Sequence, residues 1–342
     1  MLHGIKKTIM ALALVVVAGT AGQASADILV NGAGATFPYP LYSKWFSEYA
    51  KIDKSVKFNY QSIGSGGGIK QITAQTVDFG ASDKFLTDKD LAAAPGKLIH
   101  IPTVMGAVVV TYNLPGVAKG LKLDSEDVAD IFLGKITMWN DPRIAADNKG
   151  IALPAKPIIV VHRSDGSGTT AIFTDFLSGI SAEWSKNVGM GASVKWPVGL
   201  GGKGNEGVAG QVKTTPNSIG YVELAYAFEN KLAYAFLKNK VGVFVEPSIK
   251  STSAAAAGAA KQMPADYRIS LVNQPGKEAY PVVGFTWLLV YEQQKDALKG
   301  KKLVEFLTWS MTQGQAMASP MLYAPLPENV QKMVRKTIKT IK

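Results

Sequence analysis

Residues 157–177 read PIIVVHRSDGSGTTAIFTDFL, and this stretch predicts a buried strand, a tight turn and a helix in direct succession. The β-branched run at its start is typical of a buried strand. Apolar residues over 172–177 then recur at the spacing of one helix face, which places Ser167, Gly168 and Thr169 in the first helical turn. Because the N–H groups of a first turn lack intrahelical partners and the helix dipole adds positive charge there, this turn can receive an anion.

The same alternation of strand-like and helical patterns continues along the chain and predicts the α/β class with largely buried sheets. Two apolar runs, 100–114 and 279–292, are long enough to cross between two lobes, although a bent strand within one sheet would give the same pattern. Residues 251–263, STSAAAAGAAKQM, are rich in alanine and predict a surface helix.

The first 26 residues predict a secretory signal peptide. Lys6 and Lys7 precede the apolar run TIMALALVVVAG, and ASA at 24–26 is a typical cleavage site, so we expect cleavage before Asp27. The sequence contains no cysteine, which excludes disulfides, a thiolate nucleophile, cysteine-ligated zinc and a lipid-modified N-terminal cysteine. We therefore expect an exported protein that is not a lipoprotein.

The distribution of charge argues against a nucleic-acid-binding protein, and the length of the chain predicts more than one lobe. The net charge is +11, but the lysines are dispersed, with one mild cluster at 332–342 and no nucleic-acid-binding motif. We interpret this as a basic surface and expect no nucleic acid partner. Residues 27–342 exceed the size at which single cores usually stop growing, so two lobes are expected.

Three more loops share the chemistry of the 163–169 turn, in which backbone N–H groups and short hydroxyls follow a strand-like run. They are GAGATFPYP at 32–40 with Thr36, GSGGG at 64–68 with Ser65, and FGASD at 79–83 with Asp83. Phosphate and sulfate need such converging donors. Arg163 offers a planar fork to two oxygens, and Asp165 can hold that guanidinium in place.

Asp83 would discriminate between anions if it lies in this site. A carboxylate facing fully ionised sulfate is repelled, whereas a phosphate ion that retains a proton can donate it to the carboxylate. Each feature also has a structural explanation, since Gly-Ser-Gly is a common helix cap and Arg-x-Asp a common surface ion pair. The repetition of the pattern in one chain favours an anion site.

The sequence motifs typical of nucleotide-dependent enzymes and of serine hydrolases match this chain poorly or not at all. GSGTTA at 166–171 fits the dinucleotide fingerprint loosely, and GGKGN at 201–205 lacks the Walker A spacing, so we interpret it as a flexible loop. There is no G-x-S-x-G around Ser65 or Ser167, and His100 and His162 are the only histidines after the signal peptide. We expect no catalytic residue, metal or cofactor.

Six motifs in order, GAGATFP, YQSIGSGGG, VDFGASD, VHRSDGSGTT, VKWPVGLGGKGN and SIGYVELAYA, resemble the periplasmic phosphate-binding protein of the phosphate-specific ABC importer. The resemblance implies a two-lobed, type II periplasmic binding protein that holds its ligand in the inter-lobe cleft and closes about a two-segment hinge. The expected divisions are 1–26 signal peptide, 27–108 first segment of lobe 1, 109–283 lobe 2, and 284–342 second segment of lobe 1.

The resemblance also implies a ligand set and a partner. The phosphate-binding residues would be Thr36, Phe37 through its backbone N–H, Ser65, Asp83, Arg163, Ser167, Gly168 and Thr169, with Asp165 orienting Arg163. The partner would be an importer with two permease subunits and ATPase subunits, met by a monomeric binding protein in the periplasm. The alternatives are a secreted phosphatase or phosphotransferase, and a binder of arsenate, sulfate or molybdate.

Overall fold

The computed structural model describes residues 27–342, and the predicted signal peptide lies outside them. The strands are β1 (Ile28–Gly34), β2 (Val56–Ser62), β3 (Phe79–Ser82), β4 (Leu98–Asn113), β5 (Lys122–Leu123), β6 (Ile159–Arg163), β7 (Leu200–Gly202), β8 (Ser218–Glu223), β9 (Ala233–Tyr234), β10 (Phe236–Lys238), β11 (Phe244–Val245) and β12 (Val283–Tyr291). The α-helices are α1 (Tyr39–Ile52), α2 (Ser65–Thr73), α3 (Asp88–Ala92), α4 (Ser125–Phe132), α5 (Pro142–Asp147), α6 (Gly168–Ile180), α7 (Ala182–Asn187), α8 (Gly204–Thr214), α9 (Leu224–Glu229), α10 (Ile249–Ala259), α11 (Ala297–Ser310) and α12 (Glu328–Ile338). Short 3₁₀ turns lie at Ala260–Gln262, Gly314–Met317 and Ser319–Met321.

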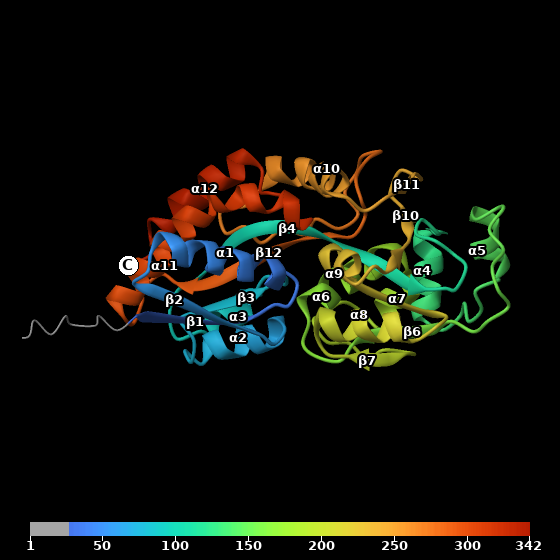
Figure 1. Ribbon diagram of the computed structural model, residues 1–342, viewed down its shortest axis with the longest axis horizontal. Coiled ribbons are helices and arrows are strands. Elements are labelled where there is room, and N and C mark those ends of the chain that lie inside the picture. Colours follow the sequence, from blue (N-terminus) through green and yellow to red (C-terminus); the bar gives the residue numbers. More distant parts are fainter. Residues whose placement is uncertain (1–26) are drawn as a thin grey trace, which may run out of the picture.

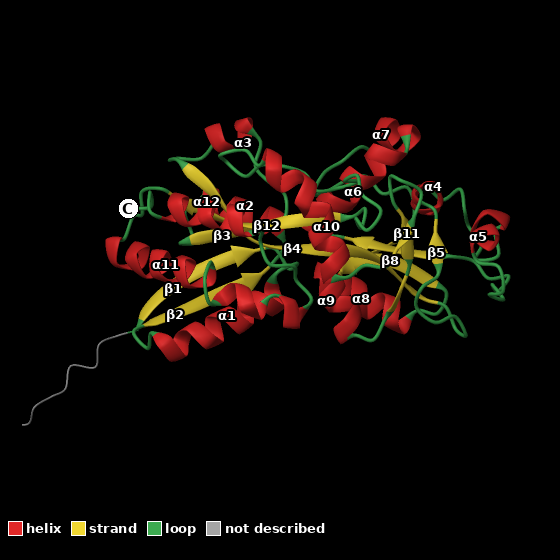
Figure 2. Cartoon of the chain, turned by 90° about the horizontal axis from the view of Figure 1, so that it is seen from above, coloured by secondary structure: helices red, strands yellow, loops and turns green. Residues whose placement is uncertain are grey.

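The principal sheet runs through the whole molecule. Its strand order is β2-β1-β3-β12-β4-β8-β6-β7, with β9 beside β4, and β11, β10 and β5 form a second, small sheet. Helices cover both faces: α1 and α8 lie on one side of the sheet, and α3 and α7 on the other (Figure 2). The chain is therefore a mixed α/β protein, as the sequence predicts.

β4 joins two halves of this sheet (Figure 1). Its residues 98–107 pair with β12, whereas 108–113 pair with β8. We call the elements around β2, β1, β3 and β12 the first lobe, and those around β8, β6 and β7 the second lobe. Val108 donates its N–H to the carbonyl of Val282 at 2.9 Å, so the expected boundaries near 108 and 283 lie side by side. The exact division of the chain at these residues remains a prediction.

Strand direction brings the loops of the two lobes together. β1 is parallel to β2 and β3, and β12 is antiparallel to both β3 and β4, so β1, β2 and β3 run in the direction of β4 toward the second lobe. β8 is antiparallel to β4, while β6 and β7 run parallel to β8, so these three run toward the first lobe. The carboxyl ends of both strand sets therefore face the junction, where α/β proteins place their ligands.

Packing explains the long apolar runs of the sequence. All nine residues of β12 are buried, because the strand lies between β3 and β4 with helices on both faces. A continuous apolar core includes Trp45 in the first lobe and Trp139 and Trp184 in the second. The alanine-rich stretch forms α10, which begins at a Ser248 capping box and packs one face against β4 and β12. Within residues 27–342, no helix is both long enough and apolar enough to cross a membrane.

Candidate functional site

Four chain segments meet where the strand ends of the two lobes face each other. In the first lobe Gly34 of β1 pairs with Ser62 of β2 and Ala81 of β3, so the residues that follow these strands leave the sheet at one edge. Those residues include Thr36, Ser65 and Asp83. The fourth segment runs from the last residue of β6 into the first turn of α6 in the second lobe and contains the predicted residues from Arg163 to Thr169.

The structure brings Asp83 and Ser65 into direct contact. The Asp83 N–H donates to Ser65 Oγ at 3.1 Å, and Ser65 Oγ lies 3.5 Å from Asp83 Oδ2. The other carboxylate oxygen, Oδ1, is buried without a hydrogen-bond partner in the described part of the chain. Burial raises the pKa of Asp83 from 3.8 to about 7, and the nearby Thr286 hydroxyl and the charge of Arg163 act in the opposite direction. This side chain is therefore a buried acceptor that can take or give a proton near neutral pH.

Arg163 is held in one orientation by Asp165. Its Nε donates to Asp165 Oδ1 at 2.7 Å and its Nη2 to Oδ2 at 2.5 Å, a bidentate pair in which the arginine side chain is 1% exposed. The Gly204 N–H donates to Oδ1 as well, at 3.1 Å. Although burial opposes it, bonding to Arg163 holds the pKa of Asp165 below its usual value. A fixed cation thus lies at the junction.

The start of α6 lies directly against the first lobe. Ser167 is the N-cap, and its Oγ accepts the Thr170 N–H at 3.0 Å. Gly168 has room for no side chain, because an added Cβ would lie 2.4 Å from Ser65 Oγ and 2.5 Å from Asp83 Oδ2. The free N–H groups and dipole of the first turn of α6 therefore point toward the Asp83 region.

The loop after β1 is anchored by hydroxyl groups from other parts of the chain. Thr36 is 2% exposed, and its carbonyl accepts the Tyr226 hydroxyl from the second lobe at 2.6 Å. The carbonyl of Phe37, whose ring is fully buried, accepts the Tyr323 hydroxyl at 2.7 Å. These bonds fix the position of the Thr36 hydroxyl and of the following backbone N–H groups.

Asn205 is a member of this cluster that the sequence analysis missed. Its Nδ2 lies 2.7 Å from Thr36 Oγ1 and 3.1 Å from Thr169 Oγ1, and its side chain is fully buried. The interpretation of 201–205 as a flexible loop is wrong: these residues end β7 and begin α8, and the first turn of α8 holds Asn205 between the lobes. Two sequence features point to it: the glycine pair before a helical pattern, and the family motif VKWPVGLGGKGN, which ends at Asn205.

The two histidines have other surroundings. His162 stacks on Trp196 with ring centroids 4.8 Å apart, and His100 Nε2 accepts the Leu86 N–H at 3.0 Å. Burial lowers the pKa of His100 to about 4, which keeps its ring neutral. No group of three or more His, Asp or Glu side chains suited to a metal ion occurs within residues 27–342.

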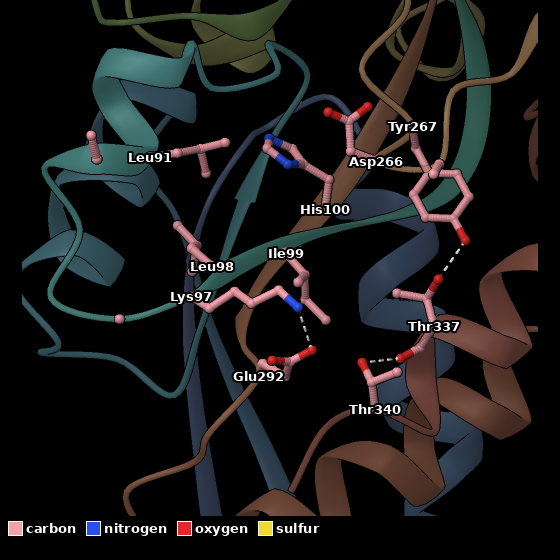
Figure 3. A pocket seen from close by; sticks show the side chains of 13 residues that line it. Leu91, Lys97, Leu98, Ile99, His100, Asp266, Tyr267, Glu292, Thr337 and Thr340 are labelled. Atoms are coloured by element: carbon pink, nitrogen blue, oxygen red, sulfur yellow. Dashed lines mark hydrogen bonds and ion pairs between the residues drawn. The ribbon is translucent and has the colours of Figure 1, made fainter.

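Figure 3 shows a cavity of about 650 Å³ that is separate from the candidate site. It lies in the first lobe between α3, the start of β4 and α12, and it contains the Lys97–Glu292 ion pair and the Tyr267–Thr337 hydrogen bond. None of the predicted site residues lines it. Size alone therefore does not identify the functional site in this protein.

Comparison with protein families and relatives agrees with this architecture. Residues 19–313 match the family model described as a PBP superfamily domain. The phosphate-binding protein PstS of Pasteurella multocida is 49% identical over 312 residues, which cover 91% of this chain and 90% of that protein. The phosphate-binding protein PstS of Methanocaldococcus jannaschii is 42% identical and covers 92% of this chain and 87% of that protein.

Solved structures show the same fold. A high-affinity periplasmic phosphate-binding protein with bound phosphate superposes with a TM-score of 0.74 at 24% identity, covering 90% of this chain and 93% of that one. The phosphate-binding protein of Stenotrophomonas maltophilia gives a TM-score of 0.68 at 23% identity with the same coverage.

Proposed function

The chain belongs to the PstS family of phosphate-binding proteins, and from this membership we propose that it binds inorganic phosphate and delivers it to an ABC importer. The family consists of substrate-binding transport proteins, not enzymes, so the phosphatase alternative does not apply. The arrangement of the site explains how it would select phosphate.

The observation that carries the proposal is the pairing of donors from both lobes with one buried acceptor. Arg163 and the first turn of α6 supply positive charge and N–H groups, while Asp83 Oδ1 is an acceptor without a partner in the described chain. A phosphate ion offers several acceptor oxygens and one proton donor, which complements this set. Sulfate offers no proton, so its oxygen would face the ionised Asp83 carboxylate without a hydrogen bond, and pairing would require Asp83 to take up a proton first.

We assign the ligand contacts to the residues that the family motifs indicate: Thr36, Phe37, Ser65, Asp83, Arg163, Ser167, Gly168 and Thr169. In this assignment Asp165 positions Arg163 and does not contact the ligand. Since the set is divided between the lobes, phosphate stabilises the closed arrangement by the contacts it makes with both. Neither lobe alone provides both the Asp83 acceptor and the Arg163 cation.

The setting follows from the same proposal. The protein acts as a monomer in the periplasm after removal of residues 1–26. Its closed, loaded form docks on the permease subunits of the importer, whose ATPase subunits drive transport. The junction supports this order of events, because closure changes the relative position of two lobe surfaces that a permease can contact together.

Calorimetric titration of residues 27–342 tests the function. The sample is first unfolded and refolded to remove bound anion, then titrated with phosphate, and with sulfate and arsenate as competitors. We expect one-to-one phosphate binding that sulfate does not displace.

Asp83→Asn keeps the side-chain size but removes the carboxylate, so phosphate binding should weaken and sulfate should begin to compete. Folded wild-type protein without phosphate affinity would contradict the proposed function. Sulfate exclusion that is unchanged in Asp83→Asn would contradict the selectivity role of Asp83.

A further inference from the structure

Asn205 makes a complete set of hydrogen bonds at the junction. Its Oδ1 accepts the backbone N–H of Glu223 at 2.9 Å. Since a backbone N–H can only donate, this bond fixes which end of the amide is oxygen, and Nδ2 must face the other way. Nδ2 has two hydrogens, and it lies within hydrogen-bond distance of two acceptors, the hydroxyl oxygens of Thr36 and Thr169.

The bonds around Asn205 determine whether the hydroxyls of Thr36 and Thr169 can accept or must donate a further hydrogen bond. Thr36 Oγ1 accepts from Asn205 Nδ2 at 2.7 Å and from the Asn205 backbone N–H at 3.2 Å. Thr169 Oγ1 accepts from Asn205 Nδ2 at 3.1 Å and from Arg163 Nη1 at 3.4 Å. A hydroxyl oxygen accepts two hydrogen bonds and donates one. With both acceptor positions occupied by groups that only donate, each hydroxyl must donate its own proton elsewhere.

We propose that Asn205 is a positioning residue that makes the hydroxyls of Thr36 and Thr169 obligate donors to the bound anion. Preset donors recognise an ionised oxygen without the cost of reorienting the hydroxyls on binding. This inference rests on the proposed phosphate binding and deepens it. Asn205 acts through the two threonines and does not itself need to touch the ligand.

The same contacts link recognition to closure. Thr36 belongs to the first lobe, and Asn205 and Thr169 belong to the second. The Thr36 hydroxyl therefore receives both of its fixed donors only when the lobes are together. In the open protein this hydroxyl is free to accept as well as to donate, so the donor set for the anion is completed by closure.

A double-mutant cycle tests this role. Thr36→Val removes the hydroxyl, Asn205→Ala removes the group that orients it, and phosphate affinity is measured for both variants, their combination and the wild type. Each single variant should bind phosphate at least about tenfold more weakly. The combination should bind more tightly than the product of the two single losses predicts, because Asn205 acts partly through Thr36; the loss that remains comes from Thr169. Losses that multiply would overturn the proposal.

Two further variants separate positioning from folding. Asn205→Asp keeps the size and the acceptor for Glu223, but its carboxylate accepts the threonine protons, so affinity should fall at least about tenfold even if the protein unfolds at the wild-type temperature. Asn239 is a buried asparagine whose amide bonds backbone groups of 241, 243, 276 and 279. Asn239→Ala should lower the unfolding temperature and leave the phosphate affinity unchanged.

The wild-type titration separates failure of phosphate binding from failure of the role of Asn205. If the wild type does not bind phosphate, the proposed function fails and the role of Asn205 fails with it. If the wild type binds and the Thr36→Val and Asn205→Ala losses multiply, or Asn205→Asp binds like the wild type, only the role of Asn205 is overturned.

Discussion

Asp83 is an ionisable side chain that is only 3% exposed. Its ionisation therefore lowers the free energy of unfolding of the ligand-free protein by a measurable amount. Its pKa is raised from 3.8 to about 7 by burial, so the folded state binds a proton more tightly than the unfolded state. The stability that this group contributes is greatest below pH 4 and decreases as the pH rises through about 7. Above about pH 7 the ligand-free protein therefore holds an unfavourably buried carboxylate at the point where a ligand proton is expected.

The first prediction is that Asp83→Asn stabilises the ligand-free protein in a pH-dependent way. Each unit of pKa shift corresponds to about 1.4 kcal/mol, so the gain of the variant over the wild type should grow by on the order of 1–4 kcal/mol between pH 4 and pH 8. Thermal or urea unfolding of phosphate-free samples measures it. Asp165, whose pKa is lowered, is the control: the loss caused by Asp165→Asn should shrink toward acid pH. A pH-independent difference for Asp83→Asn would show that this carboxylate is solvated.

The second prediction concerns Arg163, which differs from an ordinary arginine–aspartate pair by its burial. Removing a buried charged partner typically costs on the order of 2–5 kcal/mol, so Arg163→Ala should lose at least tenfold in phosphate affinity. Arg163→Lys keeps the charge but not the bidentate fork and should lose less. Arg143 is a matched control because it pairs with Asp141 at the same sequence distance but on the surface. Arg143→Ala should leave the affinity unchanged, and an equal effect of both alanine variants would remove Arg163 from the site.

At the scale of elements, the first turn of α6 depends on close approach to the first lobe. An added Cβ at Gly168 would meet Ser65 Oγ at 2.4 Å and Asp83 Cβ at 2.6 Å, so the lobes would have to move apart.

The third prediction is that Gly168→Ala lowers phosphate affinity by at least about fivefold, since overpacking of this kind costs about 1–3 kcal/mol. Gly179 lies in the same helix with no atom within 4 Å of an added Cβ. Gly179→Ala should raise stability by up to about 1 kcal/mol, because alanine is the better helix former, and should not change the affinity. Calorimetry and thermal unfolding of both variants give the comparison, and normal affinity of Gly168→Ala would mean that the bound form is more open.

The elements of the site were predictable because each one follows from a local pattern. The turn after β6, for example, combines a β-branched run, a Gly-Ser-Gly turn and helical spacing within residues 157–177. Asn205 was not predictable in this way. Its importance comes from contacts with Thr36, 169 positions away, and with Thr169, and neither contact leaves a periodic pattern in the sequence. The burial that raises the pKa of Asp83 likewise depends on residues far apart in the sequence, among them Ser65, Thr286 and Arg163.

At the scale of the whole molecule, two glycine turns connect the lobes on the face of the site. The Gly66 N–H in α2 donates to the Gly166 carbonyl before α6 at 2.8 Å. An added Cβ at either glycine would lie close to the other Cα, at 3.0 and 3.1 Å, and neither glycine has a positive φ. Since the natural sequence has no cysteine, a pair introduced here would contain the only thiols.

The fourth prediction is that Gly66→Cys with Gly166→Cys forms a disulfide that traps the closed molecule. The approaches of 3.0 and 3.1 Å are tighter than those across an ordinary disulfide, so the two turns must move slightly apart for the bond to form. If phosphate enters and leaves only when the lobes separate, protein oxidised with phosphate should exchange radiolabelled phosphate at least about tenfold more slowly than the reduced form. Protein oxidised without phosphate should fail to take it up until a reductant is added. The single-cysteine variants control for the substitutions themselves. Equal exchange by oxidised and reduced protein would show that the ligand has a path that does not require the lobes to open, and the junction would then be a fixed channel.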